Sequence, residues 1–186
     1  MRSTFFQTIR LTVVCLVFFV GVYSVTIYGF AQLAPNHGKG NVISENGKTY
    51  YSNVGQSFTK DQYFNSRPSA VAYNAAGSGG SNKAPGNPVY LAEVQARIDT
   101  FLVHNPGIDK SIIPSDLVTA SGSGLDPDIS VAAAYIQVKR IAIKRKLSES
   151  ALTQLIASNI EKPLLGLFGL SKINVLQLNL ALDKLK

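Results

Sequence analysis

The sequence is poor in the residues that cross-link chains or bind metals. Its 186 residues include one cysteine, Cys15, and two histidines, His37 and His104. A single cysteine excludes an intramolecular disulfide and a zinc site built from several cysteines. Two histidines in different parts of the chain do not make a His-rich metal site by themselves. The stability of the folded part must therefore come from its apolar core.

The motifs of common enzymes are also absent. Lys83 follows Asn82 where a P-loop requires glycine, and neither GxSxG nor HExxH occurs. No pattern supports a hydrolytic triad through His104, and a histidine near a helix C-terminus is electrostatically favourable there. We predict no catalytic residue, no metal site and no directly bound cofactor.

Positive charge is in excess but only partly clustered. The net charge is +7, from 18 Lys and Arg against 11 Asp and Glu. The densest basic group largely opposes apolar positions in helical projection, which is typical of a solvated helix face. We therefore expect no nucleic-acid partner. The members of this basic group are Lys139, Arg140, Lys144, Arg145 and Lys146.

Charge is missing altogether between Leu11 and Leu33. As a helix this run would rise about 35 Å at about 1.5 Å per residue, more than a hydrocarbon core of about 30 Å. We predict a transmembrane helix over residues 11–33. The alternative is a cleaved signal peptide, with cleavage after Gly29-Phe30-Ala31, but the apolar run is longer than a typical signal-peptide core.

The flanking charges predict the direction of this helix. Arg2 and Arg10 precede it, whereas the first charge beyond it is Lys39. The positive-inside rule therefore places residues 1–10 in the cytoplasm and the rest of the chain outside. Residues 34–40 are expected to form a juxtamembrane linker, and residues 41–186 one extracytoplasmic domain.

Helix and strand signals are mixed along this domain, which predicts a small α+β fold. Asn46-Gly47 is a strong hairpin signal between residues 42–43 and 49–51. The Gly- and Ser-rich stretch 74–87 is typical of a surface loop. Asn87-Pro88 begins a predicted helix that runs to about His104.

The second half of the domain is predicted to be mainly helical. Residues 116–120 favour a short strand, and Ser130 is a predicted N-cap. Another helix is expected from Ser148 to a point before Pro163. Residues 173–183 fit a strand leading into a short helix, with alternation at 175–180 favouring the strand. The stripe expected to be buried after Ser130 is Val131, Tyr135, Val138, Ile141 and Ala142.

Four polar residues have two interpretations each. Asp126 and Asp128 form either a carboxylate pair or acidic partners for the free amides of a helix start. Gln137 is either a contact residue or a solvent-facing amide. Arg67 is either a contact residue or the partner of a nearby carboxylate. The residues alone leave these alternatives open.

Several sequence blocks together resemble the C subunit of the Kdp-type potassium-transporting ATPase. They occur in order behind a single N-terminal membrane helix and cover nearly the whole chain. The blocks are Tyr63-Phe64-x-x-Arg67-Pro68-Ser69-Ala70, Tyr73-Asn74, Ser78-Gly79-Gly80-Ser81-Asn82, the run 116–127 (DLVTASGSGLDP) and Asn174-Val175-Leu176-x-Leu178-Asn179-Leu180-Ala181-Leu182-Asp183.

Some positions depart from the pattern of that family. Asp128 stands where many members have histidine, so any role that needs this imidazole is in doubt in this chain. Val131 stands where proline is common, and residues 83–86 (KAPG) also differ.

The resemblance implies a subunit of a high-affinity potassium uptake complex in the bacterial inner membrane. Its partners would be a channel-like potassium-binding subunit and an ATP-hydrolysing subunit, so catalysis and potassium handling would reside in those partners. The family is also described as a catalytic chaperone that raises the ATP affinity of the pump subunit. Direct ATP contact conflicts with the predicted topology, because ATP is cytoplasmic.

Two hypotheses follow. In the first, the chain is a non-catalytic accessory subunit that acts by contact with protein partners and lipid. In the alternative, it binds nucleotide through Gln137, Ser121 and Ser123. The partner-contact candidates under the first hypothesis are Gly21 and Ser24 on the membrane helix, and Arg67, Asn74, Ser78, Gly79, Gly80, Ser81, Asn82, Gly122, Gly124 and Asp126 in the domain.

The topology is testable with one engineered cysteine. We expect S57C to react with a membrane-impermeant thiol reagent in intact cells, because Ser57 follows the predicted membrane helix on the outer side. Protection of this cysteine from the reagent would contradict the predicted orientation.

Overall fold

The computed structural model describes residues 2–45 and 47–185. The chain divides into two units, residues 1–51 and 52–186. The hairpin at residues 42–51 groups with the N-terminal unit, whereas the sequence predicts a domain that begins at residue 41.

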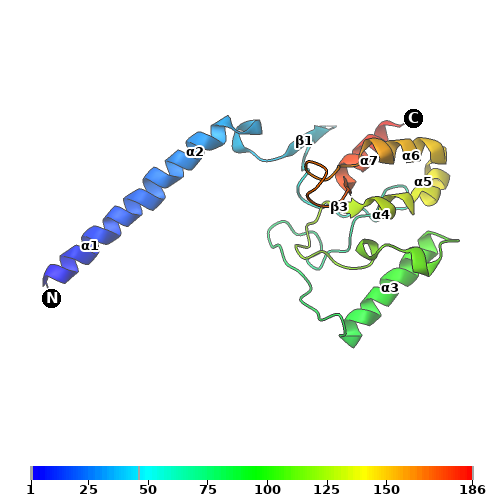
Figure 1. Ribbon diagram of the computed structural model, residues 1–186, viewed down its shortest axis with the longest axis horizontal. Coiled ribbons are helices and arrows are strands. Elements are labelled where there is room, and N and C mark those ends of the chain that lie inside the picture. The colour runs from blue at the N-terminus through cyan, green and yellow to red at the C-terminus, as the bar shows by residue number, and fades with distance from the viewer. Residues whose placement is uncertain (1, 46, 186) are drawn as a thin grey trace. The chain divides into compact units, whose positions relative to one another are not determined.

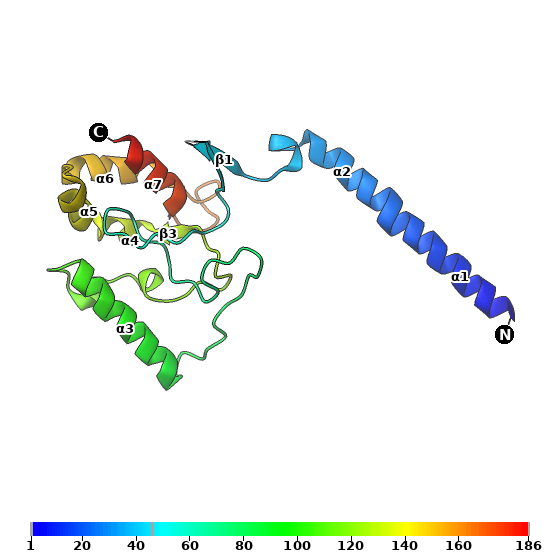
Figure 2. The same ribbon diagram turned by 180° about the vertical axis from the view of Figure 1, so that it is seen from behind.

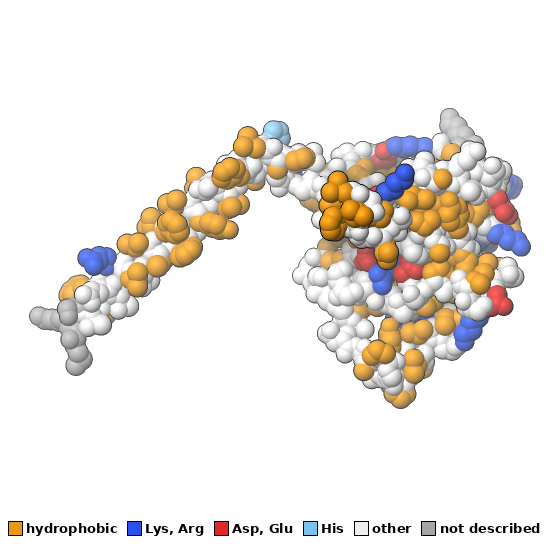
Figure 3. Space-filling model, in the orientation of Figure 1, with side chains coloured by type: hydrophobic (Ala, Val, Ile, Leu, Met, Phe, Trp, Pro, Cys, Tyr) orange, Lys and Arg blue, Asp and Glu red, His pale blue; other side chains and the backbone are white. Residues whose placement is uncertain are grey.

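The first unit contains one continuous helical run. It comprises α1 (Arg2–Leu16), a π-helical stretch η1 (Val17–Tyr23) and α2 (Ser24–Leu33). Apolar side chains line the helix in Figure 3, and Thr4–Leu33 is long and apolar enough to cross a membrane. The helical run ends at Leu33, and Ala34 adopts an extended backbone conformation before Pro35. This end is expected, because the residue before a proline disfavours the helical conformation.

Hydroxyl groups within this helix are satisfied by its own backbone. Thr8 Oγ1 donates to the Thr4 carbonyl at 2.9 Å, and Thr26 Oγ1 donates to the Val22 carbonyl at 2.7 Å. Such bonds lower the cost of placing a hydroxyl in lipid. The helix is followed by a 3₁₀ turn, η2 (Pro35–Gly38).

The predicted hairpin is confirmed. Strands β1 (Val42–Glu45) and β2 (Lys48–Tyr51) are antiparallel, with Val42 opposite Tyr51 and Glu45 opposite Lys48. Asn46, which carries the turn signal, lies outside the described residues.

The second unit is a mixture of short helices, one two-stranded sheet and long irregular segments, which confirms a mixed α and β fold. In Figures 1 and 2, α3 lies across from α6 and α7, with β3 and α4 between them. Its elements are α3 (Pro88–His104), η3 (Lys110–Ile112), η4 (Ser115–Leu117), β3 (Asp128–Ser130), α4 (Val131–Tyr135), α5 (Val138–Arg145), α6 (Glu149–Ser158), β4 (Lys172–Asn174) and α7 (Val175–Lys184).

The helices begin where side-chain oxygens cap free amides. Asn87 accepts from the amides of Val89 and Tyr90 at the start of α3. Ser130 and Ser148 do the same for α4 and α6. All three caps were predicted from the sequence, because Ser and Asn before an apolar periodic run are characteristic of a helix start.

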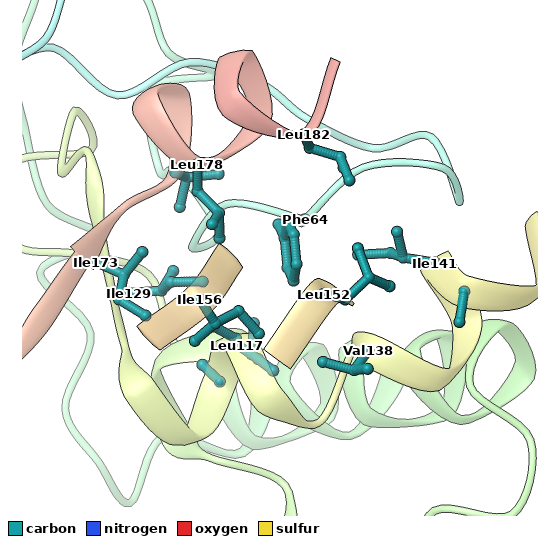
Figure 4. Close-up of a cluster of buried hydrophobic side chains, with 14 of the residues drawn as sticks. Phe64, Leu117, Ile129, Val138, Ile141, Leu152, Ile156, Ile173, Leu178 and Leu182 are labelled. Atoms are coloured by element: carbon teal, nitrogen blue, oxygen red, sulfur yellow. The ribbon is translucent and has the colours of Figure 1, made fainter. Parts of the chain in front are cut away.

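Phe64 is at the centre of the core although it belongs to no helix or strand. Figure 4 shows its ring between Leu178 and Leu182 of α7 and Ile141 and Leu152 of the α5–α6 pair. All five side chains are completely buried. Burial of an aromatic ring supplies a large apolar area to a small core. The segment around Phe64 is therefore a central part of the fold.

Strand β4 returns the end of the chain to the core. It pairs with β3 in antiparallel register, and Ile129 lies opposite Ile173. Both isoleucines are buried and join the same apolar cluster.

Three predictions about these elements were wrong. Residues 115–117 form a 3₁₀ turn, not a strand. The predicted order of a strand leading into a helix is confirmed at the C-terminus, but the strand assignment of residues 175–180 was wrong. The strand occupies only Lys172–Asn174, and residues 175–180 are helical, since the apolar positions also suit a helix. The helix after Ser130 breaks at residues 136–137, which leaves Tyr135 exposed rather than in the buried stripe.

Candidate functional site

Arg140 is a buried cation at the junction between helix α5 and the irregular segment 58–65. Its guanidinium donates from Nε to Asn105 Oδ1 at 3.0 Å and from Nη2 to Asn65 Oδ1 and Gln137 Oε1, both at 2.6 Å. It also donates to the Asp61 carbonyl. The residue is 5% exposed. The prediction that Arg140 lies on a solvated helix face is therefore wrong.

The direct acceptors of this guanidinium are neutral amide and carbonyl oxygens. Burial lowers the pKa of Arg140 to about 10, an effect that the nearby Asp61 carboxylate opposes. The group thus remains a cation at neutral pH. A buried cation without a carboxylate in direct contact depends on the full set of neutral acceptors.

Gln137 is the second member of this network. Its Oε1 accepts the Asn65 amide at 2.8 Å as well as the Arg140 bond, and its Nε2 donates to the Ala133 carbonyl at 2.9 Å. The side chain is fully buried, so the interpretation of Gln137 as a solvent-facing amide is wrong. Both polar atoms are used inside the domain, which does not favour a role as a nucleotide ligand.

Asn179 of α7 holds Phe64 in place by a pair of hydrogen bonds. Its Oδ1 accepts the Phe64 amide and its Nδ2 donates to the Phe64 carbonyl, each at 2.9 Å. The side chain thus pairs with the backbone as a neighbouring strand would. The signal in the sequence is a polar residue on the apolar face of a helix, which the alternation at 175–180 concealed by favouring a strand.

The two Ser-Gly loops that were predicted to contact partners bind each other. The amide of Gly79 and the hydroxyl of Ser78 both donate to the Ser123 carbonyl at 2.9 Å. Loops 78–82 and 121–124 therefore form one surface, which we call the paired loops. Ser78, Asn82, Gly122 and Ser123 are exposed on it.

Close backbone approach explains two glycines in the paired loops. A Cβ on Gly80 would lie 2.9 Å from the Gly122 carbonyl oxygen. A Cβ on Gly124 would lie 2.8 Å from the Gly79 carbonyl oxygen, and its φ of +67° also favours glycine. Gly122 differs, because a Cβ there meets nothing within 4 Å. Gly80 and Gly124 thus allow the two backbones to approach closely, whereas Gly122 faces open space.

Three further bonds tie the paired loops to the segment after Phe64. Arg67 pairs with Asp126 at 2.8 Å, which is the local carboxylate partner that one interpretation of Arg67 predicted. Ser69 Oγ donates to the Gly124 carbonyl at 2.6 Å, and Ser121 donates its amide to the Pro68 carbonyl at 3.3 Å.

The two serines proposed as nucleotide ligands also have internal bonds. Ser121 is buried and its Oγ accepts the Gly124 amide at 2.9 Å. Ser123 Oγ accepts the Leu125 amide at 3.1 Å. Neither Gln137 nor these serines line the cavity of about 490 Å³ that lies beside α3.

Asp126 precedes strand β3 and Asp128 is the first residue of that strand, so the interpretation that they satisfy helix amides is wrong. Asp126 Oδ1 accepts the Asp128 amide at 3.0 Å. The Asp128 carboxylate pairs with Lys172 on β4. This bond raises the pKa of Lys172 against the opposing effect of burial. The acidic residue at a position where histidine is common thus has a basic partner across the sheet.

A cavity of about 490 Å³ lies between α3 and segment 58–73. No motif in the sequence indicated it. Its polar lining includes Asp61, Arg97 and His104. Asp61 accepts from His104 Nδ1 at 2.7 Å and pairs with Lys144 at 3.2 Å. Burial raises the pKa of Asp61, but the bonds from Lys144 and His104 outweigh it and hold that pKa below the ordinary value.

The remaining candidates do not belong to the paired loops. Gly21 and Ser24 belong to the helical run of the first unit, where a Cβ on Gly21 would meet nothing within 4 Å. Asn74 is exposed, and its side chain accepts the Ala76 amide at 3.0 Å. Among the described residues, no group of three or more His, Cys, Asp or Glu is placed to hold a metal ion.

The buried network predicts a large stability difference between two adjacent basic residues. R140M should lower the free energy of unfolding by several kcal/mol, because each buried acceptor left unpaired costs about 1–3 kcal/mol. R140K should retain charge but lose most of the four bonds, and so be intermediate. K139M, a change at an exposed neighbour, should alter stability by less than about 0.5 kcal/mol.

Denaturant unfolding of the full chain in detergent, followed by circular dichroism, measures these differences. If R140M were as stable as K139M, the buried network would not support the fold.

Comparison with known proteins agrees with the resemblance found in the sequence. The profile of the family described as "K+-transporting ATPase, c chain" matches residues 5–184. A protein of Flavobacterium psychrophilum, called potassium-transporting ATPase KdpC subunit, is 57% identical over 182 residues, which cover 97% of this chain and 98% of the relative. A relative of the same name from Bacteroides thetaiotaomicron is 51% identical over 188 residues, covering 99% and 100%.

A more distant relative with this name, from Caldanaerobacter subterraneus subsp. tengcongensis, is 47% identical over 178 residues, covering 95% of this chain and 92% of its own. The family match includes most of the N-terminal helix, the Phe64 segment, the paired loops and α7. The chain belongs to the KdpC family of K+-transporting ATPase subunits.

Proposed function

We propose that this chain is a non-catalytic accessory subunit of an ATP-driven potassium uptake complex. It assembles and stabilises the channel-like and ATP-hydrolysing subunits and promotes productive use of ATP by them. It is held in the bacterial inner membrane by its N-terminal helix, with residues 1–10 in the cytoplasm and the second unit outside. Family membership supports the assignment to the transporter, and the paired loops support a role in contact.

The observation that carries the contact role is the construction of the paired loops. Their backbones are bonded to each other, so their shape is set before any partner binds. Their exposed residues, Ser78, Asn82, Gly122 and Ser123, carry no charge. A preformed surface of this kind binds with little loss of conformational entropy and without burying an unpaired charge.

The buried network gives this surface a rigid base. Arg140, Gln137 and Asn179 fix the backbone on either side of Phe64. The chain then continues through Arg67 and Ser69, which bind Asp126 and Gly124 beside the paired loops. Gln137 and Arg67, which the sequence suggests as contact residues, thus hold the backbone of the domain in position.

On the membrane helix, Gly21 and Ser24 are three residues apart and therefore lie on one side. Small residues with this spacing allow close approach of a neighbouring helix. Ser24 Oγ is 3.4 Å from the Phe19 carbonyl, so its own helix can satisfy the hydroxyl. We propose that this side of the helix packs against the channel-like subunit.

The paired loops can be tested with a bulky residue at Gly122. G122Y should leave the fold intact, because a Cβ there meets nothing within 4 Å. It should abolish or greatly weaken co-purification of the partner subunits in mild detergent from cells grown at low potassium, because the new ring occupies the docking surface.

The matched control is G86Y. Gly86 is also exposed with nothing within 4 Å of its Cβ position, but it lies outside the paired loops. Circular dichroism of both variants checks the fold. If G122Y retained the partner subunits as well as G86Y does, the paired loops would not be the contact surface.

The alternative of direct nucleotide binding makes a separate prediction. We expect isothermal titration of ATP into the full chain in detergent to show no saturable submillimolar binding, because both polar atoms of Gln137 and the hydroxyl of Ser121 already have internal partners. Saturable submillimolar binding that is lost in the S121A and S123A variants would favour the nucleotide hypothesis instead.

A further inference from the structure

Residues 163–170 form an exposed apolar loop between α6 and β4, and we call it the leucine loop. Its sequence is PLLGLFGL. Neither the paired loops nor the buried network uses it. Its large side chains are among the most exposed apolar groups of the second unit, at 70% for Leu164, 80% for Leu165, 80% for Leu167, 64% for Phe168 and 88% for Leu170.

A contiguous apolar surface of this kind is costly in water. Exposed single leucines are common, but five large apolar side chains within seven residues indicate an interaction site. The same residues would have joined the core if they served folding. The exposure therefore requires an apolar partner outside the second unit.

Four backbone amides of the leucine loop donate within the loop. The amide of Leu164 donates to the Phe168 carbonyl at 3.0 Å, and the amides of Leu167 and Phe168 both donate to the Leu164 carbonyl, at 3.1 and 3.0 Å. The amide of Gly166 donates to the Pro163 carbonyl at 2.9 Å, and Pro163 has no amide hydrogen. These internal bonds lower the cost of placing those groups in an apolar medium, since lipid tails offer no hydrogen bonds.

The turn itself does not explain the leucines. Leu165 has a φ of +55° and Gly166 a φ of +74°. Glycine or asparagine suits a left-handed position better than leucine. A large apolar side chain at Leu165 thus opposes both the local backbone preference and its contact with water, so its benefit must come from something that it contacts.

The choice between lipid and protein follows from the chemistry of the loop. No side chain from 163 to 170 can donate or accept a hydrogen bond, whereas protein interfaces carry about one hydrogen bond per 100–200 Å². Lys162 precedes the loop, is exposed, and is followed by no Asp or Glu up to Lys172. A basic residue beside an apolar tip complements the anionic headgroups above a hydrocarbon layer.

The N-terminal helix would also keep the leucine loop close to a bilayer. Thr4–Leu33 is long and apolar enough to span it, and only residues 34–51 connect that helix to the second unit. A covalent tether raises the effective concentration of the loop at the membrane surface. Even a weak insertion would then be populated.

We propose that the leucine loop inserts into the surface of the phospholipid bilayer in which the N-terminal helix is anchored. This inference rests on the membrane anchoring in the proposed function. The apolar tip lies at the boundary between headgroups and acyl chains, and Lys162 lies among the phosphates. The insertion gives the second unit a second attachment to the membrane and restricts its orientation.

A single introduced tryptophan tests the insertion, because the natural chain contains none. The full-length L167W chain is reconstituted into vesicles of phosphatidylethanolamine and phosphatidylglycerol, with and without brominated acyl chains. We expect a blue-shifted emission and strong quenching by the brominated lipid. The matched control is V103W, at a residue of α3 that is 78% exposed and that should be quenched weakly.

A second variant keeps the turn but removes an apolar side chain. L165N in the L167W background should reduce the quenching, since asparagine tolerates a left-handed position. Quenching of L167W no stronger than that of V103W, in vesicles with which the chain floats, would overturn insertion and leave the helical anchor intact. Failure to float would overturn both. Shielding of L167W only in the assembled transporter, without bromine quenching, would assign the loop to a protein partner and overturn the proposal.

Discussion

The fold of the second unit depends on one requirement, which is that an irregular segment passes through the core with its backbone polar groups satisfied. Phe64 supplies the largest side chain at the centre of the core. Because residues 58–73 form no helix or strand, their amides and carbonyls have no regular partners. Asn179 of α7, Arg140 of α5 and Gln137, just before α5, supply those partners. Buried polar groups are costly unless they are bonded, so this network must form as a unit.

That requirement also explains the arrangement of the surface. The segment fixed at Phe64 continues to Arg67 and Ser69, whose side chains reach the chain near Asp126 and Gly124. Loop 121–124 in turn accepts bonds from Ser78 and Gly79. Hydrogen bonds at both ends of segment 65–69 therefore connect the buried cation, through that segment, to the exposed paired loops. Rigid loops on a rigid scaffold are a common basis for recognition.

This arrangement agrees with a subunit that acts by contact. In the proposed topology the second unit is on the opposite side of the membrane from ATP, and its influence on ATP use would pass through the partner subunits. Such coupling requires different contacts with two conformations of the pump. Two attachments to the bilayer, the helix and the leucine loop, would keep the paired loops in a fixed orientation. The cost of docking would then be lower, because fewer orientations are lost on binding.

Local features of the sequence were sufficient to predict the long apolar N-terminal helix, the hairpin and the helix starts. The uncharged run 11–33, Asn46-Gly47, and the caps Asn87, Ser130 and Ser148 each depend on neighbouring residues only. The order of the family blocks was also sufficient to indicate the transporter. These features are determined by interactions within a few residues, or by the length of hydrocarbon that a helix must cross.

The tertiary structure alone decided which polar residues are buried. Arg140 belongs to a basic group that the helical pattern places in solvent, yet Asp61 and Asn65 cover it from a segment 75 or more residues earlier. The apolar alternation at 175–180 favours a strand, although the apolar positions of residues 173–183 also fit a helix. Contact of Leu178 and Leu182 with Phe64 requires the helix. Contacts between distant segments change the environment of a side chain without changing its local pattern, and this is why the sequence located the anchor and the caps but not the network that holds the domain together.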